Sequence, residues 1–231
     1  MRKIGIIGGI SWESTAEYYR IINEEVKERV GGSHSAECLM YSFDFGEVEK
    51  LQSGGEWEEL TRQMVFWAGK LKNAGADFII ICANTMHMMA PDIEKECDIK
   101  VLHIADVTGR KIRERGFKKV ALLGTRYVME GTFYHDVLKQ KHDIDVINPS
   151  KEQREIVHNI IYDELIKGVV KNESRKKYVE IIEDLERKGA QGVVLGCTEI
   201  PMLVSQKDVS IPVFSTTEIH AKAAVDFALD D

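Results

Sequence analysis

Several features that would place this chain in a broad class are missing from it. No apolar run reaches roughly 18 residues, so the sequence predicts no membrane span. No dense run of Lys or Arg occurs and the formal net charge is −7, which argues against a nucleic-acid-binding surface. The start Met1-Arg2-Lys3-Ile4 leads straight into a strand-like run and lacks a signal-peptide cleavage pattern. These absences favour a protein with neither membrane nor nucleic acid as a partner.

The cysteines are few and widely spaced. They are Cys38, Cys82, Cys97 and Cys197, and no two of them form a Cys-x-x-Cys pair. This spacing predicts neither a disulfide scaffold nor a zinc site, and it fits a reducing cytoplasm. Gly8-Gly9 lacks the third glycine of a dinucleotide-binding Gly-x-Gly-x-x-Gly fingerprint. The sequence therefore indicates a cytoplasmic chain without a recognisable metal or nucleotide motif.

Short apolar runs alternate with longer amphipathic segments along the 231 residues, of which 44% are hydrophobic. Near-continuous apolar runs predict buried strands, and apolar residues at helical spacing predict helices. The alternation implies an α/β fold with mainly parallel sheet covered by helices on both faces. Strands are expected at 4–7, 39–45, 78–81, 101–104, 120–123, 146–147, 193–195 and 213–214, and helices at 14–30, 56–74, 86–97, 106–115, 129–141, 151–170, 174–188 and 217–229.

The series of elements restarts near the middle of the chain. Gly124 follows Gly8 by 116 residues, Ala190 follows Ala76 by 114, and the segment around Val213 follows its counterpart around Val101 by 112. Offsets that change this slowly predict two similar α/β halves, although any two α/β stretches can look alike by chance. We place the first half at residues 1–98 plus 212–231 and the second at residues 99–211.

Two strand ends resemble each other closely. The offset of 114 residues carries Ala83, which precedes Asn84-Thr85, onto Cys197, which precedes Thr198-Glu199. Ligands of parallel α/β sheets collect at the carboxyl ends of strands, so both positions are candidates for a site. A helix beginning after Cys197 is expected to lower the pKa of its thiol, whereas an inert buried thiol is the alternative. Cys82 is expected to point to the opposite face from Ala83, into the core.

The polar residues beside these strand ends each have a structural alternative. Asn84, Thr85 and Thr198 suit a carboxylate or amine ligand, but Asn and Thr are also good helix N-caps. Glu199 is expected to orient the thiol or to bind an ammonium group. Its alternative role is that of an exposed first-turn carboxylate favoured by the helix dipole.

Three further residues are candidates on weaker grounds. Gln52 lies in a Gly-rich segment that is expected to form a loop over the site. Lys167 either meets a substrate carboxylate or is solvated. His87 is as compatible with packing or capping as with chemistry.

The combined motifs carry a family resemblance. The chain resembles the aspartate/glutamate racemase family over essentially its whole length, and most of all its broad-specificity or L-aspartate/glutamate-specific branch. The stretches that carry the resemblance are Ile6 to Thr15, Gly55-Glu56-Trp57, Asn84 to His87, His103 to Asp106, Leu122 to Tyr127 and Gly196 to Glu199.

The resemblance implies two pseudo-symmetric α/β domains with the active site in the cleft between them, no cofactor, and a homodimer. It also implies a two-base mechanism with one cysteine before Asn-Thr and another before Thr-Glu. The second is Cys197, while the first falls on Ala83, which neither takes nor gives a proton. The ligand-contacting positions implied by the resemblance are Ile10, Gln52, Asn84, Thr85, Thr125, Lys167 and Thr198.

Racemisation removes the α-proton from one face of an amino acid and returns a proton to the other. Backbone N–H groups beside Asn84, Thr85 and Thr198 are expected to stabilise the enolate-like charge. We therefore predict a cofactor-independent racemase for aspartate- or glutamate-like substrates, with Cys197 as one acid/base and an impaired or one-directional activity because of Ala83. The alternatives are a single-cysteine decarboxylase or isomerase of the same superfamily, and a non-catalytic amino-acid-binding protein.

Overall fold

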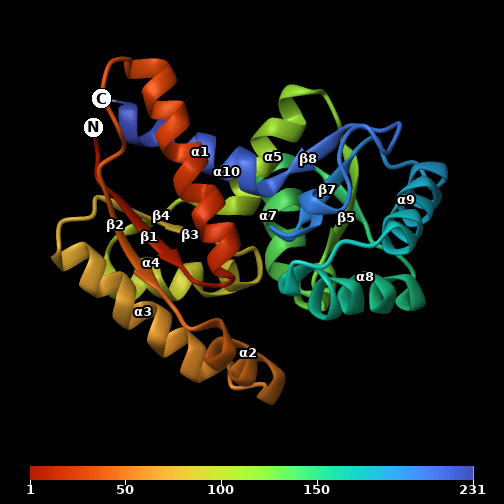
Figure 1. Cartoon of the computed structure of the whole chain (residues 1–231), viewed down its shortest axis with the longest axis horizontal. Coiled ribbons are helices and arrows are strands. Elements are labelled where there is room, and N and C mark those ends of the chain that lie inside the picture. The colour runs from red at the N-terminus through yellow and green to blue at the C-terminus, as the bar shows by residue number, and fades with distance from the viewer. Residues whose placement is uncertain (231) are drawn as a thin grey trace. The chain divides into compact units, whose positions relative to one another are not determined.

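The computed structural model describes residues 1–230 and contains two four-stranded parallel sheets (Figure 1). The strand order is β2-β1-β3-β4 in the first sheet and β6-β5-β7-β8 in the second, so the two sheets share one topology. Helices flank both sheets, which confirms the predicted α/β fold of two similar halves. The strands are β1 (Ile4–Gly8), β2 (Cys38–Ser42), β3 (Phe78–Ile81), β4 (Lys100–Val101), β5 (Lys119–Gly124), β6 (Asp145–Ile147), β7 (Val193–Gly196) and β8 (Val213–Ser215).

Helices cover both faces of the first sheet (Figure 1). α1 (Trp12–Val30) lies on one face, and α3 (Trp57–Asn73) and α4 (Ala90–Cys97) lie on the other. α3 buries Leu60, Met64 and Ala68 at a spacing of one helical turn, and these side chains join Ile79 and Ile81 in one core. The 3-10 turn Thr85–Met89 connects β3 to α4, and α2 (Phe45–Gly54) precedes α3.

The second sheet packs in the same way. α8 (Lys151–Asp163) and α9 (Asn172–Arg187) form a core with alternate residues of β5 and β7. α8 begins with a capping box in which the Ser150 hydroxyl accepts from the Gln153 N–H and the Gln153 side chain accepts from the Ser150 N–H. No helix within residues 1–230 is both long and apolar enough to cross a membrane. The remaining elements are α5 (Ile104–Glu114), α6 (Arg126–Glu130), α7 (Thr132–His142), α10 (Thr216–Leu229) and the 3-10 turns Leu165–Lys167 and Ile200–Met202.

The strand registers reproduce the sequence repeat residue by residue. Ile7 pairs with Ile81 in the first sheet, and Leu123 pairs with Leu195 in the second. Ile7 of β1 and Leu123 of β5 are 116 residues apart, and Ile81 of β3 and Leu195 of β7 are 114 apart, as in the sequence repeat. The offset of 112 recurs where Val213 of β8 takes the place that Val101 has in β4. The sequence repeat is therefore a repeat of sheet topology.

The chain forms two compact units. Unit 1 comprises residues 1–104 and the segment from His220 onward, and unit 2 comprises residues 105–219. These boundaries differ from 1–98 plus 212–231 and 99–211 because β4 pairs with β3, and β8 pairs with β7. The edge strand β4 therefore belongs to the first sheet, and the edge strand β8 belongs to the second. The chain changes unit only afterwards, near the start of α5 and within α10.

Several segments differ locally from the sequence prediction. The helix predicted over 151–170 ends at Asp163, and the strand predicted over 101–104 is only Lys100–Val101. The sequence predicts a Gly-rich loop around Gln52, but this residue lies in the last turns of α2, which ends where Gly55 adopts a left-handed conformation at φ 73°. The sequence also predicts one helix over 129–141, where the structure has α6 and α7. Gly131 separates these two helices with an extended backbone, and a Cβ atom there would lie 2.4 Å from the Tyr127 carbonyl oxygen.

Candidate active site

The thiol of Cys197 lies just after β7 and is hydrogen-bonded to a buried carboxylate. Its Sγ is 3.0 Å from Oε2 of Glu199, which also accepts a hydrogen bond of 2.8 Å from the Thr198 hydroxyl. Cys197 is 8% exposed and Glu199 is 6% exposed. Because a thiol donates and a carboxylate accepts, this geometry describes an S–H group pointing at Glu199. Glu199 is thus not the exposed first-turn residue of the alternative reading.

The environment of Cys197 favours its protonated form. Burial raises the pKa of the Cys197 thiol well above its usual range, and the Glu199 carboxylate raises it further. The backbone N–H groups of Glu199 and Thr198 oppose this with a smaller lowering of the pKa. The expectation of a lowered pKa is therefore wrong, because only the short 3-10 turn Ile200–Met202 follows and loss of solvation dominates. At neutral pH this site holds a proton that it can donate.

The position after β3 that corresponds to Cys197 is Ala83, which has no thiol. Ala83, Asn84 and Thr85 are all buried there, and Thr85 begins the 3-10 turn. The Asn84 side chain makes no capping hydrogen bond to that turn. Thr125, after β5, does act as an N-cap, since its hydroxyl accepts from the N–H of Val128 at 3.3 Å. The capping alternative raised for Asn84 is therefore not observed, whereas Thr125, which the resemblance gave only as a ligand-contacting position, is an N-cap.

Ala83 and Cys197 occupy the same face of their sheets. Ala83 belongs to the core of Ile79 and Ile81 on the α3 side, and Cys197 belongs to the core of Val193 and Leu195 on the α8 side. Within the described residues, Cys82 does not belong to the core that contains Ala83. Burial raises the pKa of the Cys82 thiol far above its usual range, so it is unsuited to proton transfer. Its placement fits a packing role.

The turn between β1 and α1 brings Ile10 to the same end of the first sheet. Gly9 has φ 80°, and its N–H donates to the Thr15 hydroxyl at 2.8 Å. A Cβ atom on Gly9 would lie 2.2 Å from the Phe43 carbonyl oxygen, so only glycine fits. This turn leaves Ile10 buried in the core that also contains Ala83.

The predicted residues gather at two places, one in each unit. In unit 1, the Gln52 amide contacts Met86 Sδ at 3.5 Å, which places Gln52 beside the turn that follows Ala83. In unit 2, Gly124 pairs with Gly196, so Thr125 and Cys197 follow neighbouring strand ends. Lys167 is exposed at the end of its 3-10 turn, and its role stays a prediction.

Sequence reasoning missed three histidines beside these strand ends. His158 of α8 accepts the Arg126 N–H at 3.2 Å, immediately after Thr125. The rings of His103 and His220 both lie beside the ring of His87, near Ala83. The motif around His103 hinted at its importance, but His158 and His220 are far from the strand ends in sequence and give no local signal.

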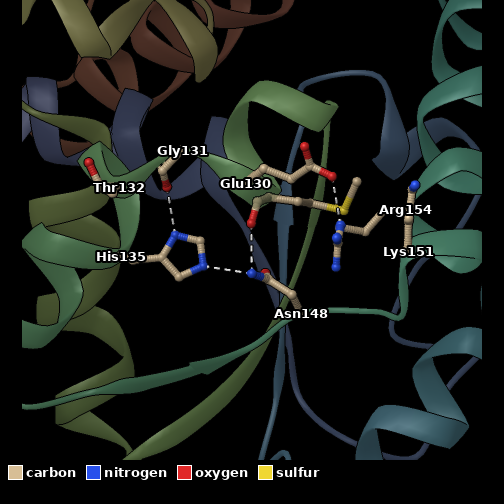
Figure 2. Close-up of a pocket in the computed structure, with 8 residues that line it drawn as sticks. Glu130, Gly131, Thr132, His135, Asn148, Lys151 and Arg154 are labelled. Carbon is tan, nitrogen blue, oxygen red and sulfur yellow. Dashed lines mark hydrogen bonds and ion pairs between the residues drawn. The ribbon is translucent and has the colours of Figure 1, made fainter.

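A separate cavity of about 600 Å³ lies in unit 2 and is not lined by any of the predicted site residues (Figure 2). There the Asn148 amide donates to the Met129 carbonyl at 2.6 Å and to Nε2 of His135 at 2.9 Å. His135 in turn donates from Nδ1 to the Gly131 carbonyl at 2.8 Å. These bonds hold the break between α6 and α7 against the segment before α8, which is a structural role. Glu130, Thr132, Lys151 and Arg154 complete the charged and polar lining.

Within residues 1–230, no group of three or more His, Cys, Asp or Glu side chains is arranged to hold a metal ion. The polar groups at the two strand ends are instead a thiol, a carboxylate, hydroxyls, an amide and backbone N–H groups. At each strand end taken by itself, such groups suit hydrogen bonds to a carboxylate or an ammonium group.

Comparisons with known proteins identify the family. A family model described as Asp/Glu/Hydantoin racemase matches residues 7–224. The broad specificity amino-acid racemase RacX of Bacillus subtilis is 22% identical over 230 residues, which are 96% of each chain. A crystal structure from Yersinia pestis, provisionally described as an Asp/Glu racemase, is 50% identical with a TM-score of 0.94, and an aspartate racemase homologue from Pyrococcus horikoshii is 37% identical with a TM-score of 0.85. Both alignments cover the whole of each chain. The chain therefore belongs to the Asp/Glu/Hydantoin racemase family.

Proposed function

We propose that this chain is a cofactor-independent amino-acid racemase for aspartate- or glutamate-like substrates, in which Cys197 moves the α-proton on one face. The observation that carries the proposal is the buried pair of the Cys197 thiol and the Glu199 carboxylate, 3.0 Å apart at the end of β7. Membership of the racemase family supports the reaction class, since racemisation requires a group that breaks and remakes a Cα–H bond.

The pair supports a complete proton cycle on its own face. Glu199 is placed to accept the thiol proton, which leaves a thiolate at Sγ. The thiolate then takes the α-proton of the substrate, the Cα–H electron pair stays on the substrate as an enolate-like anion, and the S–H bond re-forms. Because the pKa of Cys197 is raised by burial, its thiolate is a strong base in this site. Once the proton on Sγ has exchanged with solvent, reversal of the step returns a solvent-derived proton to the same face.

Inversion also needs a proton from the opposite face, and Ala83 has none to give. The strand registers and the shared core face support Ala83 as the counterpart of Cys197. The proposal requires that both strand ends face one bound substrate, with backbone N–H groups beside Asn84, Thr85 and Thr198 stabilising the developing charge. Exchange with retention of configuration is then faster than inversion.

The test is solvent-deuterium incorporation with each enantiomer of aspartate and of glutamate. NMR of the α-position measures exchange, and chiral chromatography measures inversion. We expect exchange to exceed inversion by at least about tenfold, because acid–base groups typically contribute 10²–10⁴-fold. Cys197→Ser should abolish exchange, and Cys82→Ala is the matched thiol control that should retain it. Absence of exchange with all four substrates would contradict the proposal.

The same proposal includes a homodimer without a cofactor, as the resemblance implies, and a cytoplasmic location, which the cysteine spacing favours. Exhaustive dialysis against EDTA and treatment with hydroxylamine should leave exchange unchanged. Light scattering should give twice the chain mass of 26.2 kDa. Loss of exchange on either treatment, or a monomer at working concentration, would contradict this part.

A second candidate function follows from Ala83 itself. Decarboxylation of a malonate-type substrate followed by protonation from one face needs only one thiol, and the structure has one thiol at the two equivalent positions. Carbon dioxide release from malonate-type substrates, with no exchange of aspartate or glutamate, would favour this reaction over racemisation. Ligand-induced thermal stabilisation without any turnover would instead favour an amino-acid-binding protein.

A further inference from the structure

Three histidines and a tyrosine form a cluster beside the Ala83 strand end, here called the histidine cluster: His87, His103, His220 and Tyr18. The ring centroid of His87 is 5.0 Å from that of His103 and 5.3 Å from that of His220. The Tyr18 hydroxyl is 2.9 Å from Nδ1 of His220. His87, His220 and Tyr18 have no exposed surface. The cluster joins α1, the turn after β3, the connection after β4, and α10.

The hydrogen bonds define which ring nitrogen carries the proton in two of these histidines. Nδ1 of His87 is 2.8 Å from the carbonyl oxygen of Ala83, and Nε2 of His220 is 2.7 Å from that of Leu102. A carbonyl oxygen only accepts, so His87 carries a proton on Nδ1 and His220 carries one on Nε2. Nδ1 of His220 is then free to accept from the Tyr18 hydroxyl. No hydrogen-bond donor among the described residues reaches Nε2 of His87.

Both rings stay neutral. Burial lowers the pKa of His87 well below its usual range, and His103 and His220 lower it further. Burial also lowers the pKa of His220 to about 3. No carboxylate contributes to either shift. A second proton would create a buried cation without a counter-charge, so each imidazole remains a fixed donor of one hydrogen bond.

His87 makes two hydrogen bonds to the segment that contains Ala83, the position of the missing opposite-face group. Its ring Nδ1 donates to the carbonyl of Ala83, and its backbone N–H donates to the carbonyl of Asn84 at 3.1 Å. The turn from Ala83 to His87 is thus closed by two bonds from one residue.

The chain leaves unit 1 after Ile104 and returns at His220, so His103 and His220 lie next to the two positions at which it changes unit.

The equivalent end of β7 has no histidine at the corresponding positions. The offset of 114 residues that relates Ala83 to Cys197 carries His87 onto Pro201, and the offset of 112 carries His103 onto Ser215. In unit 2 a carboxylate contacts the reactive group directly, whereas in unit 1 an imidazole holds the backbone. The histidine cluster is therefore specific to the Ala83 side and does not belong to the repeated scaffold.

We propose that His87 is a positioning residue, which fixes the turn from Ala83 to Thr85 for the substrate carboxylate, and that His103, His220 and Tyr18 lock its ring orientation. This inference rests on the proposed function, because the backbone N–H groups of that turn are assigned to the substrate there. It adds a residue that touches neither substrate nor reacting atoms. Loss of the bond from His87 to Ala83 misplaces donors that act most strongly in the transition state.

The first test uses the unmodified protein and does not depend on activity. Long-range ¹H–¹⁵N correlation spectra of the histidine side chains report which ring nitrogen carries the proton. We expect a proton on Nδ1 of His87 and on Nε2 of His220, unchanged from pH 8 to pH 5. A proton on Nε2 of His87, or a doubly protonated ring at pH 7, would overturn the inference.

The second test compares two substitutions of His87 by solvent-deuterium exchange. Asn places an amide donor near the position of Nδ1, whereas Leu has similar bulk and no donor. We expect His87→Leu to lower kcat for exchange about tenfold with KM changed less than about threefold, and His87→Asn to stay within about threefold of the parent. Equal losses in the two variants, or no loss in His87→Leu, would overturn the inference.

His135 is a matched control within the same chain. It makes the same bond from Nδ1 to the carbonyl four residues earlier, also at 2.8 Å, but it lines the separate cavity of unit 2. His135→Leu should leave kcat and KM within about twofold of the parent, and an equal loss there would show a general structural effect and overturn the inference. A parent without any exchange contradicts the proposed function, while the ring-proton measurement still decides the geometry of the histidine cluster.

Discussion

At the end of β7 a thiol donates to a carboxylate, whereas at the equivalent end of β3 a methyl group follows the strand and a histidine holds the backbone. The two ends agree in strand order, register and core face, so the difference between them does not arise from the fold. Sheet topology depends on apolar side chains along the strands, while the chemistry depends on one or two residues just beyond them. A repeated scaffold can therefore hold two unequal sites.

The turns after the first strand of each half differ in a similar way. After β1 the chain needs a glycine at φ 80°, because Phe43 leaves no room for a Cβ atom at Gly9. After β5 the Thr125 hydroxyl caps α6 with the backbone in an ordinary extended conformation. One turn thus depends on steric freedom and the other on a hydrogen bond.

The largest expected effect is a change that makes the two strand ends chemically alike. Ala83→Cys should raise two-way racemisation by at least about 100-fold, because a second acid/base group typically contributes 10²–10⁴-fold. Chiral chromatography of aspartate and glutamate in both directions measures this. Ala83→Ser tests whether volume alone suffices and should have little effect. If Ala83→Cys gains nothing, the equivalence of the two ends does not extend to one shared substrate.

The turn comparison predicts unequal losses of stability. Gly9→Ala should lower the free energy of unfolding by about 3 kcal/mol, because it combines a positive φ with a clash against backbone. Thr125→Ala should cost only about 1 kcal/mol, the usual effect of a lost N-cap, and Thr125→Ser should restore most of it. Urea denaturation followed by circular dichroism measures all three variants. Equal costs for Gly9→Ala and Thr125→Ala would contradict this account.

Glu199→Gln separates the carboxylate from the thiol that it contacts. Burial is the largest cause of the raised pKa of Cys197, and the Glu199 carboxylate is the second largest. Removal of the carboxylate charge should therefore shift alkylation of Cys197 to lower pH. Deuterium exchange should nevertheless fall by about tenfold or more, because the amide cannot accept the thiol proton. Peptide mass spectrometry after iodoacetamide treatment measures the first effect, with buried Cys82 as the unreactive control. Faster exchange in this variant would contradict the role of Glu199.

A further expected effect is acid sensitivity in unit 1. Because the pKa values of His87 and His220 are lowered in the folded state, the unfolded chain binds more protons below about pH 6.5. Stability is therefore greatest above that pH and should fall by up to about 1.4 kcal/mol per pH unit for each histidine as the pH drops toward 4.

Tryptophan fluorescence is suited to this measurement, because Trp12, Trp57 and Trp67 all lie in unit 1. Urea titrations at pH 7 and pH 5 give the change in the free energy of unfolding. His87→Asn should remove one histidine's part of that change, and His135→Asn in unit 2 should not. An unchanged pH dependence in His87→Asn would contradict the assignment to His87.

Local patterns predicted most of the scaffold and part of the site. The apolar runs at Ile4–Ile7 and Phe78–Ile81 and the offsets of 116, 114 and 112 residues predicted the strands and their repetition, because they depend on residues close together in the chain. The loop predicted around Gln52 was wrong, because the nearby glycines suggested a loop, whereas Gly55 ends a helix that contains Gln52. The single helix predicted over 129–141 was wrong because one extended glycine divides it.

The sequence by itself determined the two similar α/β halves and the correspondence of Ala83 with Cys197, since strand periodicity and spacing are local properties. Only the tertiary structure decided that Cys197 is buried against Glu199 with a raised pKa, because desolvation depends on everything packed around a group. It also decided that Tyr18, His87, His103 and His220 meet, although 202 residues separate the two members that share a hydrogen bond. No spacing rule links positions that far apart, because they come into contact only when helices from both ends of the chain pack on the first sheet.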